Sequence, residues 1–247
     1  MTSRVDSIRQ RYEHTLEQIA QAARTSGRTD SEVRLVVVTK SQPLAVLRDA
    51  LSAGIRRFGE NYPEEAVTKI ESLAAESGVE WHMIGHVQSR KARLVVDRFA
   101  LLHSLDSLKL AQRLDRFAGE QSHTLSVLLE FNVGGEDSKS GWDASDEHRW
   151  DQLRPDVEAV LALPNLQVRG LMTMPPLGNE AEASRPYFQR LRQLRDELAQ
   201  RYPQAEWHEL SMGTSADFAV AVEEGASLVR VGTAIVGARQ PKPESLP

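Results

Sequence analysis

The sequence contains no cysteine among its 247 residues. This absence excludes disulfide bonds, thiolate metal sites and cysteine nucleophiles. Long hydrophobic runs are missing too, since none approaches the ~20 residues that a membrane-spanning helix needs. The first residues, MTSRVDSIRQRYEH, lack the apolar run of a signal peptide. We therefore expect a cytoplasmic protein with no membrane contact.

Positive charge is not in excess either. There are 30 Lys and Arg against 35 Asp and Glu, so the formal net charge is −5, which argues against nucleic acid as the main partner. Hydrophobic residues (40%) and charged residues (26%) stand at ordinary levels for a globular protein. No linker or shift in composition divides the chain. We therefore expect one domain over residues 1–247.

One stretch, RLVVVTK at residues 34–40, organises the rest of the chain. Its four apolar residues are mostly β-branched and predict a strand that is buried on both faces, as in a parallel sheet. Lys40 follows this strand, and Pro43 is well placed to open a helix. A lysine at a strand end either extends its charged head into solvent or, when its pKa is lowered, attacks a carbonyl to form a Schiff base. This stretch alone leaves both interpretations open.

The same strand-and-helix pattern recurs along the chain. Strands are predicted at about 34–38, 57–61, 80–84, 101–103, 124–133, 166–172, 206–210 and 227–231. Strict alternation predicts parallel strands with right-handed crossovers. Eight units in this length favour a closed (β/α)8 TIM barrel over an open sheet, with the barrel at about 33–238. An amphipathic helix at about 3–27 precedes it, and the proline-containing tail 239–247 is expected to be loose.

Small residues and hydroxyls gather after the last two predicted strands. They are Ser211, Gly213, Thr214 and Ser215 in one loop, and Gly232 and Thr233 in the next. TIM barrels often bind phosphate at these two loops, where glycine lets the backbone approach an anion and hydroxyls donate to its oxygens. Each loop alone is better explained as a turn that caps a helix. Together, in this order, they predict a phosphate site.

Lys40 and these two loops lie side by side in a closed barrel, because the eighth strand pairs with the first. A phosphorylated aldehyde would bridge them, with its aldehyde on the lysine and its phosphate in the loops. Pyridoxal 5′-phosphate is the candidate, held as a covalent aldimine with Lys40. His82 and His86 do not have the spacing of a helical ligand pair, so no metal site is expected.

Seven motifs in order give the chain a specific resemblance. They are VVVTKSQP, FGENYPEE, WHMIGHVQSRKAR, FNVGGEDSKSG, GLMTMP, LSMGTSADF and VRVGTAIVG. From about residue 5 to 238 the chain resembles the YggS/PROSC family of pyridoxal phosphate homeostasis proteins.

The resemblance implies a fold, a site and a role. The fold is a single barrel like the N-terminal domain of alanine racemase (fold type III of the pyridoxal phosphate proteins) without the second, β-rich domain. The cofactor is bound through the lysine that matches Lys40, and the role is pyridoxal phosphate homeostasis inside the cell. The implied cofactor-binding residues are Lys40, Asn61 and Met172 beside the ring, Ser211, Gly213, Gly232 and Thr233 at the phosphate, and Arg230 in the same pocket.

We expect a carrier or regulator rather than an enzyme with robust catalysis. A racemase needs two bases, one on each face of the substrate, and Tyr62 is the only tyrosine predicted near the mouth of the barrel. Arg230, if it faces the pyridine nitrogen, weakens the ring as an electron sink. We expect a monomer that passes the cofactor to pyridoxal-phosphate-dependent apoenzymes. A racemase-like enzyme that uses the cofactor and a Schiff-base aldolase without cofactor stay open as alternatives.

Overall fold

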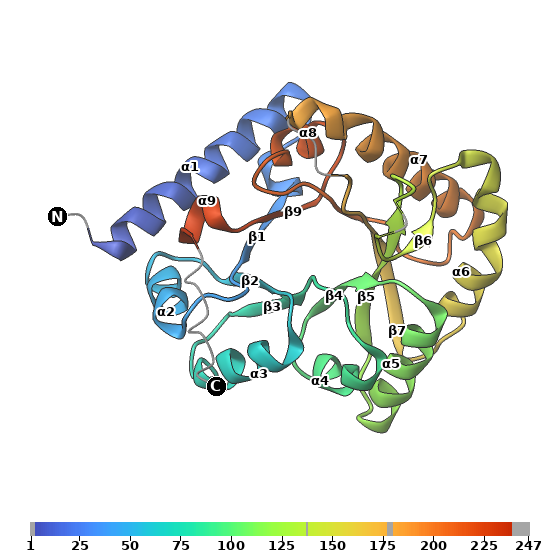
Figure 1. The fold of residues 1–247 in the computed structure, drawn as a ribbon, viewed down its shortest axis with the longest axis horizontal. Helices are drawn as coiled ribbons and strands as arrows, with labels where there is room; N and C mark the ends of the chain where they lie inside the picture. Colours follow the sequence, from blue (N-terminus) through green and yellow to red (C-terminus); the bar gives the residue numbers. More distant parts are fainter. Residues whose placement is uncertain (1–2, 137, 177–179, 239–247) are drawn as a thin grey trace.

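The computed structural model describes residues 3–136, 138–176 and 180–238. In this part of the chain eight parallel strands close into a barrel that the helices surround (Figure 1). The predicted TIM barrel is thereby confirmed. The predicted loose tail, residues 239–247, lies outside the described residues.

Neighbouring strands of the barrel follow the chain order. The ring runs β1-β2-β3-β4-β5-β7-β8-β9, and β9 pairs with β1 to close it. The closing register sets Val37 opposite Val231. The barrel strands are β1 (Arg34–Val38), β2 (Arg57–Glu60), β3 (Glu80–Met83), β4 (Leu101–Leu105), β5 (Leu125–Asn132), β7 (Leu166–Met172), β8 (Glu209–Ser211) and β9 (Leu228–Val231).

Helices connect the strands on the outside. The α-helices are α1 (Arg4–Thr25), α2 (Leu44–Ser52), α3 (Pro63–Ser72), α4 (Arg93–Val96), α5 (Leu108–Glu120), α6 (Arg154–Leu161), α7 (Arg185–Arg201), α8 (Phe218–Glu223) and α9 (Thr233–Val236). Short 3-10 helices lie at η1 (Asp30–Glu32), η2 (Ser89–Lys91), η3 (Glu147–Leu153) and η4 (Ala181–Ser184). The predicted additional N-terminal helix is α1, which Ser3 caps and which packs against α2, α8 and α9.

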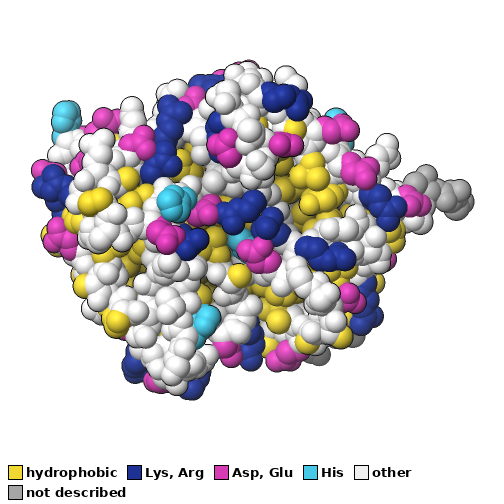
Figure 2. All heavy atoms as spheres, turned by 180° about the vertical axis from the view of Figure 1, so that it is seen from behind, with side chains coloured by type: hydrophobic (Ala, Val, Ile, Leu, Met, Phe, Trp, Pro, Cys, Tyr) yellow, Lys and Arg dark blue, Asp and Glu magenta, His cyan; other side chains and the backbone are white. Residues whose placement is uncertain are grey.

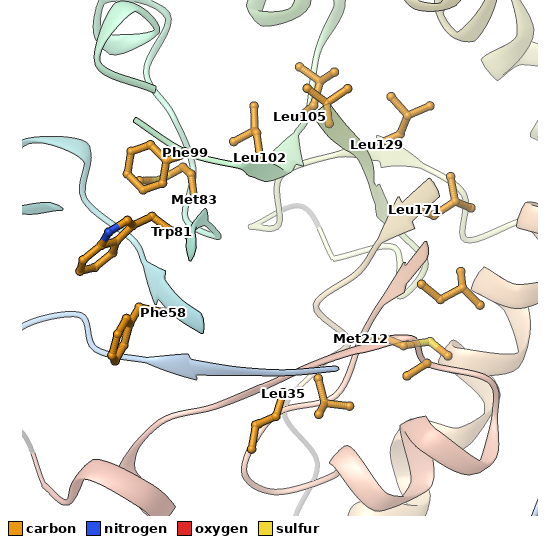
Figure 3. Close-up of a cluster of buried hydrophobic side chains, with 14 of the residues drawn as sticks. Leu35, Phe58, Trp81, Met83, Phe99, Leu102, Leu105, Leu129, Leu171 and Met212 are labelled. Atoms are coloured by element: carbon orange, nitrogen blue, oxygen red, sulfur yellow. The ribbon is translucent and has the colours of Figure 1, made fainter. Parts of the chain in front are cut away.

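Strand side chains alternate between the helix layer and the barrel interior, because successive residues of a strand point to opposite faces. Leu35, Phe58 and Trp81 belong to the main hydrophobic cluster, which includes helix residues and part of which is drawn in Figure 3. A smaller cluster contains Val36 and Leu228. Burying the apolar outer face stabilises the barrel by about 25 cal/mol for each Å² removed from water.

Strands β8 and β6 differ from the sequence expectation. Strand β8 spans Glu209–Ser211 rather than 206–210, because ladder pairing with β7 begins at Glu209. Ser211 is therefore the last residue of the strand and not part of the loop that follows. The short strand β6 (Trp142–Asp143) pairs with the end of β5 outside the barrel and was not predicted.

The surface carries charges of both signs. On the face opposite to that of Figure 1, Lys and Arg side chains are interspersed with Asp and Glu (Figure 2). This mixture fits the modest net charge of −5. None of the helices in the described ranges is both long enough and apolar enough to cross a membrane.

Candidate cofactor-binding site

A pocket of ≈ 410 Å³ opens where the barrel strands end. Its wall combines residues at or after the ends of β1, β2, β3, β7, β8 and β9 with Glu130 near the end of β5. The volume lies in the range of small-molecule sites, ~300–1,000 Å³. The pocket therefore lies at the carboxyl end of the strands, where TIM barrels place their functional groups.

Lys40 lies in the pocket wall two residues after β1 and is half-buried. Helix α3 holds the backbone on both sides of it. The carbonyl of Thr39 accepts a hydrogen bond from Lys69 Nζ at 2.7 Å, and the N–H of Ser41 donates to Glu65 Oε1 at 2.7 Å. Ser41 has a φ of 58°, in the left-handed region that non-glycine residues seldom adopt. The contacts with α3 thus fix the turn that presents Lys40.

Lys69 of α3 also belongs to a buried ionic cluster. We call it the Lys69 cluster, and it is formed by Thr39, Glu60, Glu65 and Lys69. Lys69 Nζ donates to Glu60 Oε1 at 2.8 Å and to Glu65 Oε1 at 2.6 Å, and Thr39 Oγ1 donates to Glu60 Oε1 at 2.6 Å. Burial raises the pKa of Glu60, and the Lys69 cation opposes this effect. Glu60 and Lys69 are buried, so each charge depends on the other.

The loops after β8 and β9 form the part of the wall beside Lys40. Thr214 donates from its N–H and its hydroxyl to Asp217 Oδ1, at 2.7 and 3.0 Å. The N–H of Gly232 donates to Ser215 Oγ at 3.3 Å. A Cβ at Gly232 would lie 3.2 Å from the carbonyl oxygen of Val38, so glycine lets the end of β9 approach β1 closely. Thr214, Ser215 and Thr233 bring hydroxyls to this part of the wall, and a hydroxyl can donate a hydrogen bond to a phosphate oxygen.

The structure brings most of the predicted site residues together. Lys40, Asn61, Met172, Arg230, Gly232 and Thr233 all line the pocket. Their individual contacts with a cofactor stay predictions.

Ser211 and Gly213 are not among the residues that line the pocket. Ser211 is fully buried at the end of β8. Gly213 has a φ of 90°, and a Cβ there would lie 2.6 Å from the Cβ of Ala221, so its glycine allows the loop to pack on α8. Thr214 and Ser215 are the hydroxyl residues of this loop that reach the pocket.

Arg230 is a fixed cation in the wall. Its side chain is 4% exposed, and its NH2 group donates to the carbonyl of Thr173 at 2.9 Å. The NH1 group donates to Ser211 Oγ. Burial lowers the pKa of Arg230 to about 10, and the negative charges of Glu130 and Asp217 oppose this effect. The guanidinium stays charged at neutral pH.

Glu130 is a pocket residue that the sequence analysis missed. It is 8% exposed, lines the pocket, and has no hydrogen-bond partner for Oε2 within the described structure. Burial raises the pKa of Glu130 to about 7, with a further contribution from the nearby Asp106. The sequence does contain a sign of this role, because Glu130 places a carboxylate within the apolar run Thr124–Val133. A charged residue is rarely buried unless it is paired or has a function.

Asp106 and His86 meet at the rim, with 2.5 Å between Oδ2 and Nδ1. Asp106 also lies just before the start of α5, but it does not cap this helix. Ser107 caps α5 instead and accepts a hydrogen bond from the N–H of Leu110 at 3.4 Å. The reason is that β4 continues to Leu105, so Asp106 lies one residue too early for the cap.

These groups fit pyridoxal 5′-phosphate by their chemistry. A primary amine lies across the β1–β9 pair from hydroxyl-containing loops, and an amide and a cation complete the wall. The cofactor, when bound, would supply an aldehyde that condenses with an amine and a ring that withdraws electrons. The buried carboxyl of Glu130 would face the same space and can hold or release a proton near neutral pH.

Comparison with known proteins indicates one family. Residues 9–240 match the family model of the alanine racemase N-terminal domain. The pyridoxal phosphate homeostasis protein of Aquifex aeolicus is 40% identical over 231 residues, which are 94% of this chain and 98% of that protein. The protein of the same name from Vibrio cholerae is 41% identical over 236 residues, 94% of this chain and 97% of the relative.

Solved structures give the same fold. PipY of Synechococcus elongatus with pyridoxal phosphate bound is 40% identical, with a TM-score of 0.76, over 89% of this chain and 100% of that chain. Alanine racemase from Corynebacterium glutamicum has a TM-score of 0.66 at 19% identity, over 98% of this chain and 63% of that chain. The second likeness concerns the barrel alone.

Proposed function

Because this chain belongs to the alanine racemase N-terminal domain family and to its pyridoxal phosphate homeostasis proteins, we propose that it binds pyridoxal 5′-phosphate through Lys40 and takes part in the homeostasis of this cofactor. The observation that carries the proposal is the pocket itself. Lys40 lines it together with three hydroxyl residues, Thr214, Ser215 and Thr233. PipY, 40% identical to this chain, has been solved with the cofactor bound.

We assign a role in cofactor binding to each group of residues in the wall. Lys40 forms the imine bond, and Asn61 and Met172 flank the ring. Gly232 and Thr233 hold the phosphate, with the loop of Ser211 and Gly213 beside them. Arg230 supplies a positive charge from the end of β9. Because these groups come from different strands, the rigid barrel would hold the cofactor in one orientation.

The proposed role is that of a carrier or regulator without robust catalysis, acting in the cytoplasm and supplying apoenzymes. None of the four tyrosines is among the residues that line the pocket in the described part of the chain. Tyr62 is 53% exposed. A racemase would be expected to use a tyrosine of the pocket as its second base, and these observations do not support such a role. The one feature that favours a weak side activity is Glu130, a titratable carboxyl in the wall.

Replacing Lys40 tests the cofactor assignment. The purified protein, supplied with pyridoxal 5′-phosphate, should show the visible absorbance of an imine. Borohydride should fix the cofactor to the peptide that contains Lys40. Lys40→Ala should lose both signals, whereas Lys109→Ala, which removes an exposed lysine of α5, should keep them.

Two other outcomes would redirect the proposal. If no absorbance develops after addition of the cofactor, the cofactor assignment fails and the Schiff-base aldolase becomes the better explanation. If amino acids racemise at a rate that depends on both Lys40 and the cofactor, the protein is an enzyme. Chiral chromatography of the amino acid measures this rate directly.

A further inference from the structure

Five side chains form a continuous hydrogen-bonded series, the polar chain, which is Glu80, His82, His103, Ser211 and Arg230. Glu80 Oε1 lies 3.0 Å from His82 Nε2, and His82 Nδ1 lies 2.7 Å from His103 Nε2. His103 Nδ1 lies 2.7 Å from Ser211 Oγ, to which Arg230 NH1 donates. The two histidines and Ser211 are fully buried. Water therefore does not compete for these bonds.

The polar chain connects opposite ends of the barrel. Glu80 is the first residue of β3 and lines a separate pocket of ≈ 190 Å³ together with Arg34 and Glu209, the first residues of β1 and β8. Arg230 lies near the end of β9, in the wall of the cofactor pocket. His82 lies two residues before Ile84, which also lines the cofactor pocket. A carboxylate at one end is thus linked to a cation at the other.

The chemistry of the two ends fixes the direction of every bond. Arginine only donates, and an ionised carboxylate only accepts. Glu80 is ionised, since its bond with His82 and then Arg57 lower its pKa to about 2. The Ser211 hydroxyl accepts from Arg230 and so donates its proton to His103 Nδ1. His103 then donates from Nε2 to His82 Nδ1, and His82 donates from Nε2 to Glu80.

The reverse direction fails on proton count. It leaves the Ser211 hydroxyl proton without an acceptor in the polar chain and requires a second proton on His82. Burial disfavours such a cation, because it lowers the pKa of His82 and lowers that of His103 well below its usual value. Both imidazoles are therefore neutral, with the proton on Nε2.

We propose that Glu80, His82, His103 and Ser211 position Arg230 in the cofactor pocket and stabilise its charge there. All three neutral groups turn their acceptor atoms toward Arg230 and their donor atoms toward Glu80, so their dipoles stabilise both end charges. Arg230 is thereby held with NH1 on the polar chain and NH2 on Thr173. The effect on cofactor binding rests on the proposed function, whereas the polar chain itself does not.

The tautomers test the polar chain in the wild-type protein without cofactor. Two-bond ¹⁵N–¹H correlation spectra distinguish Nε2–H, Nδ1–H and cationic imidazoles. His82→Gln and His103→Gln assign the two signals by their loss. We expect both residues to be neutral Nε2–H forms at neutral pH. A cation or an Nδ1–H form at either position would overturn the proposal.

Cofactor affinity tests the positioning role with a matched pair of variants. Glu80→Met and Arg57→Met remove the same ion pair, whose Nε–Oε2 distance is 2.8 Å, but only Glu80→Met ends the polar chain. We expect Glu80→Met to weaken pyridoxal phosphate binding about fivefold, as a modest loss of interaction would. Arg57→Met should bind like the wild type. Spectrophotometric titration gives the three dissociation constants.

The comparison separates this proposal from direct contact of Ser211 with the phosphate. Direct contact predicts that Glu80→Met binds as tightly as Arg57→Met, and that result would overturn the positioning role. If Glu80→Met does not fold, the tautomers of the wild-type protein still decide. If the wild type binds no cofactor, the proposed function fails, while the tautomers remain a test of the polar chain.

Discussion

Glu130 shows how the chemistry of a single residue depends on its place. In an extended peptide its carboxyl would be ionised at neutral pH, with an ordinary pKa of 4.5. In the barrel it is buried, Oε2 has no hydrogen-bond partner among the described residues, and Asp106 adds negative charge, so the pKa of Glu130 rises to about 7. The pocket wall therefore contains an acid that is half-protonated near neutral pH.

This shift predicts the pH dependence of stability. Between the two pKa values the folded protein keeps a proton that the unfolded chain releases. The stability that Glu130 contributes is thus complete below pH 4.5 and is lost as the pH rises through about 7. From about pH 5 to about pH 8 the loss should be about 2 to 3 kcal/mol. Urea unfolding of the apoprotein and of Glu130→Gln at both pH values measures it.

The glutamine variant serves as the control, because all other carboxyls titrate alike in both proteins. The stability difference between Glu130→Gln and wild type should shift in favour of the variant at the higher pH. An equal difference at both pH values would show that Glu130 ionises normally in the fold.

At the scale of elements, α3 supports the turn that carries Lys40. Glu65 and Lys69 are four residues apart on this helix and so lie on one face. From there Glu65 bonds to the backbone of Ser41 and Lys69 to that of Thr39, on either side of Lys40. Without these bonds the backbone around Lys40 could adopt several turns. The helix thus does more than cover the outside of the barrel.

Replacing Lys69 should be costly. Lys69→Met leaves Glu60 buried without its cation, and the Thr39 carbonyl loses a donor. We expect a loss of about 3 kcal/mol in the free energy of unfolding, in the range for breaking a buried ion pair. The double variant Glu60→Gln/Lys69→Met should recover part of it, because no unpaired charge remains. Urea unfolding at neutral pH gives the values.

Lys91 provides the comparison on the surface. It pairs with Glu64 of α3, but half of the Glu64 side chain is exposed, so Lys91→Met should cost about 1 kcal/mol or less. If Lys69→Met costs no more than Lys91→Met, the Lys69 cluster does not support the turn.

At the scale of the whole molecule, the surface offers few apolar contacts for a partner copy. Among described residues, the large hydrophobic side chains that stand exposed are Leu16 (38%), Tyr62 (53%) and Met174 (37%). They lie on α1, before α3 and after β7, respectively. Scattered single residues of this kind do not form the large apolar patch of a stable interface.

We therefore predict a monomer. Sedimentation equilibrium should give the mass of one chain across a wide range of protein concentration. A mass of two chains that persists on dilution would contradict this prediction and point to an interface that the exposed side chains do not reveal.

Local patterns were enough to predict the eight barrel strands, although with shifted bounds for β8, and also their parallel order and the place of Lys40. The run of β-branched residues before Lys40 and the proline after it specify a buried strand, its end and a helix start through short-range sterics. Closure of the barrel was then expected from alternation and length, since eight such units in a chain of this length favour a closed ring over an open sheet. The residues named for the pocket followed from these strand ends and from the family motifs.

Only the tertiary structure decided which groups meet inside that ring. Ser211 was expected in a loop, but its hydroxyl bonds to His103, 108 residues away. Glu130 acquires its raised pKa because neighbouring strands exclude water from it. Hydrogen bonding and desolvation depend on distances between strands that are far apart in sequence. Such distances exist only after the barrel has closed, so the sequence determined the frame and the fold determined its interior chemistry.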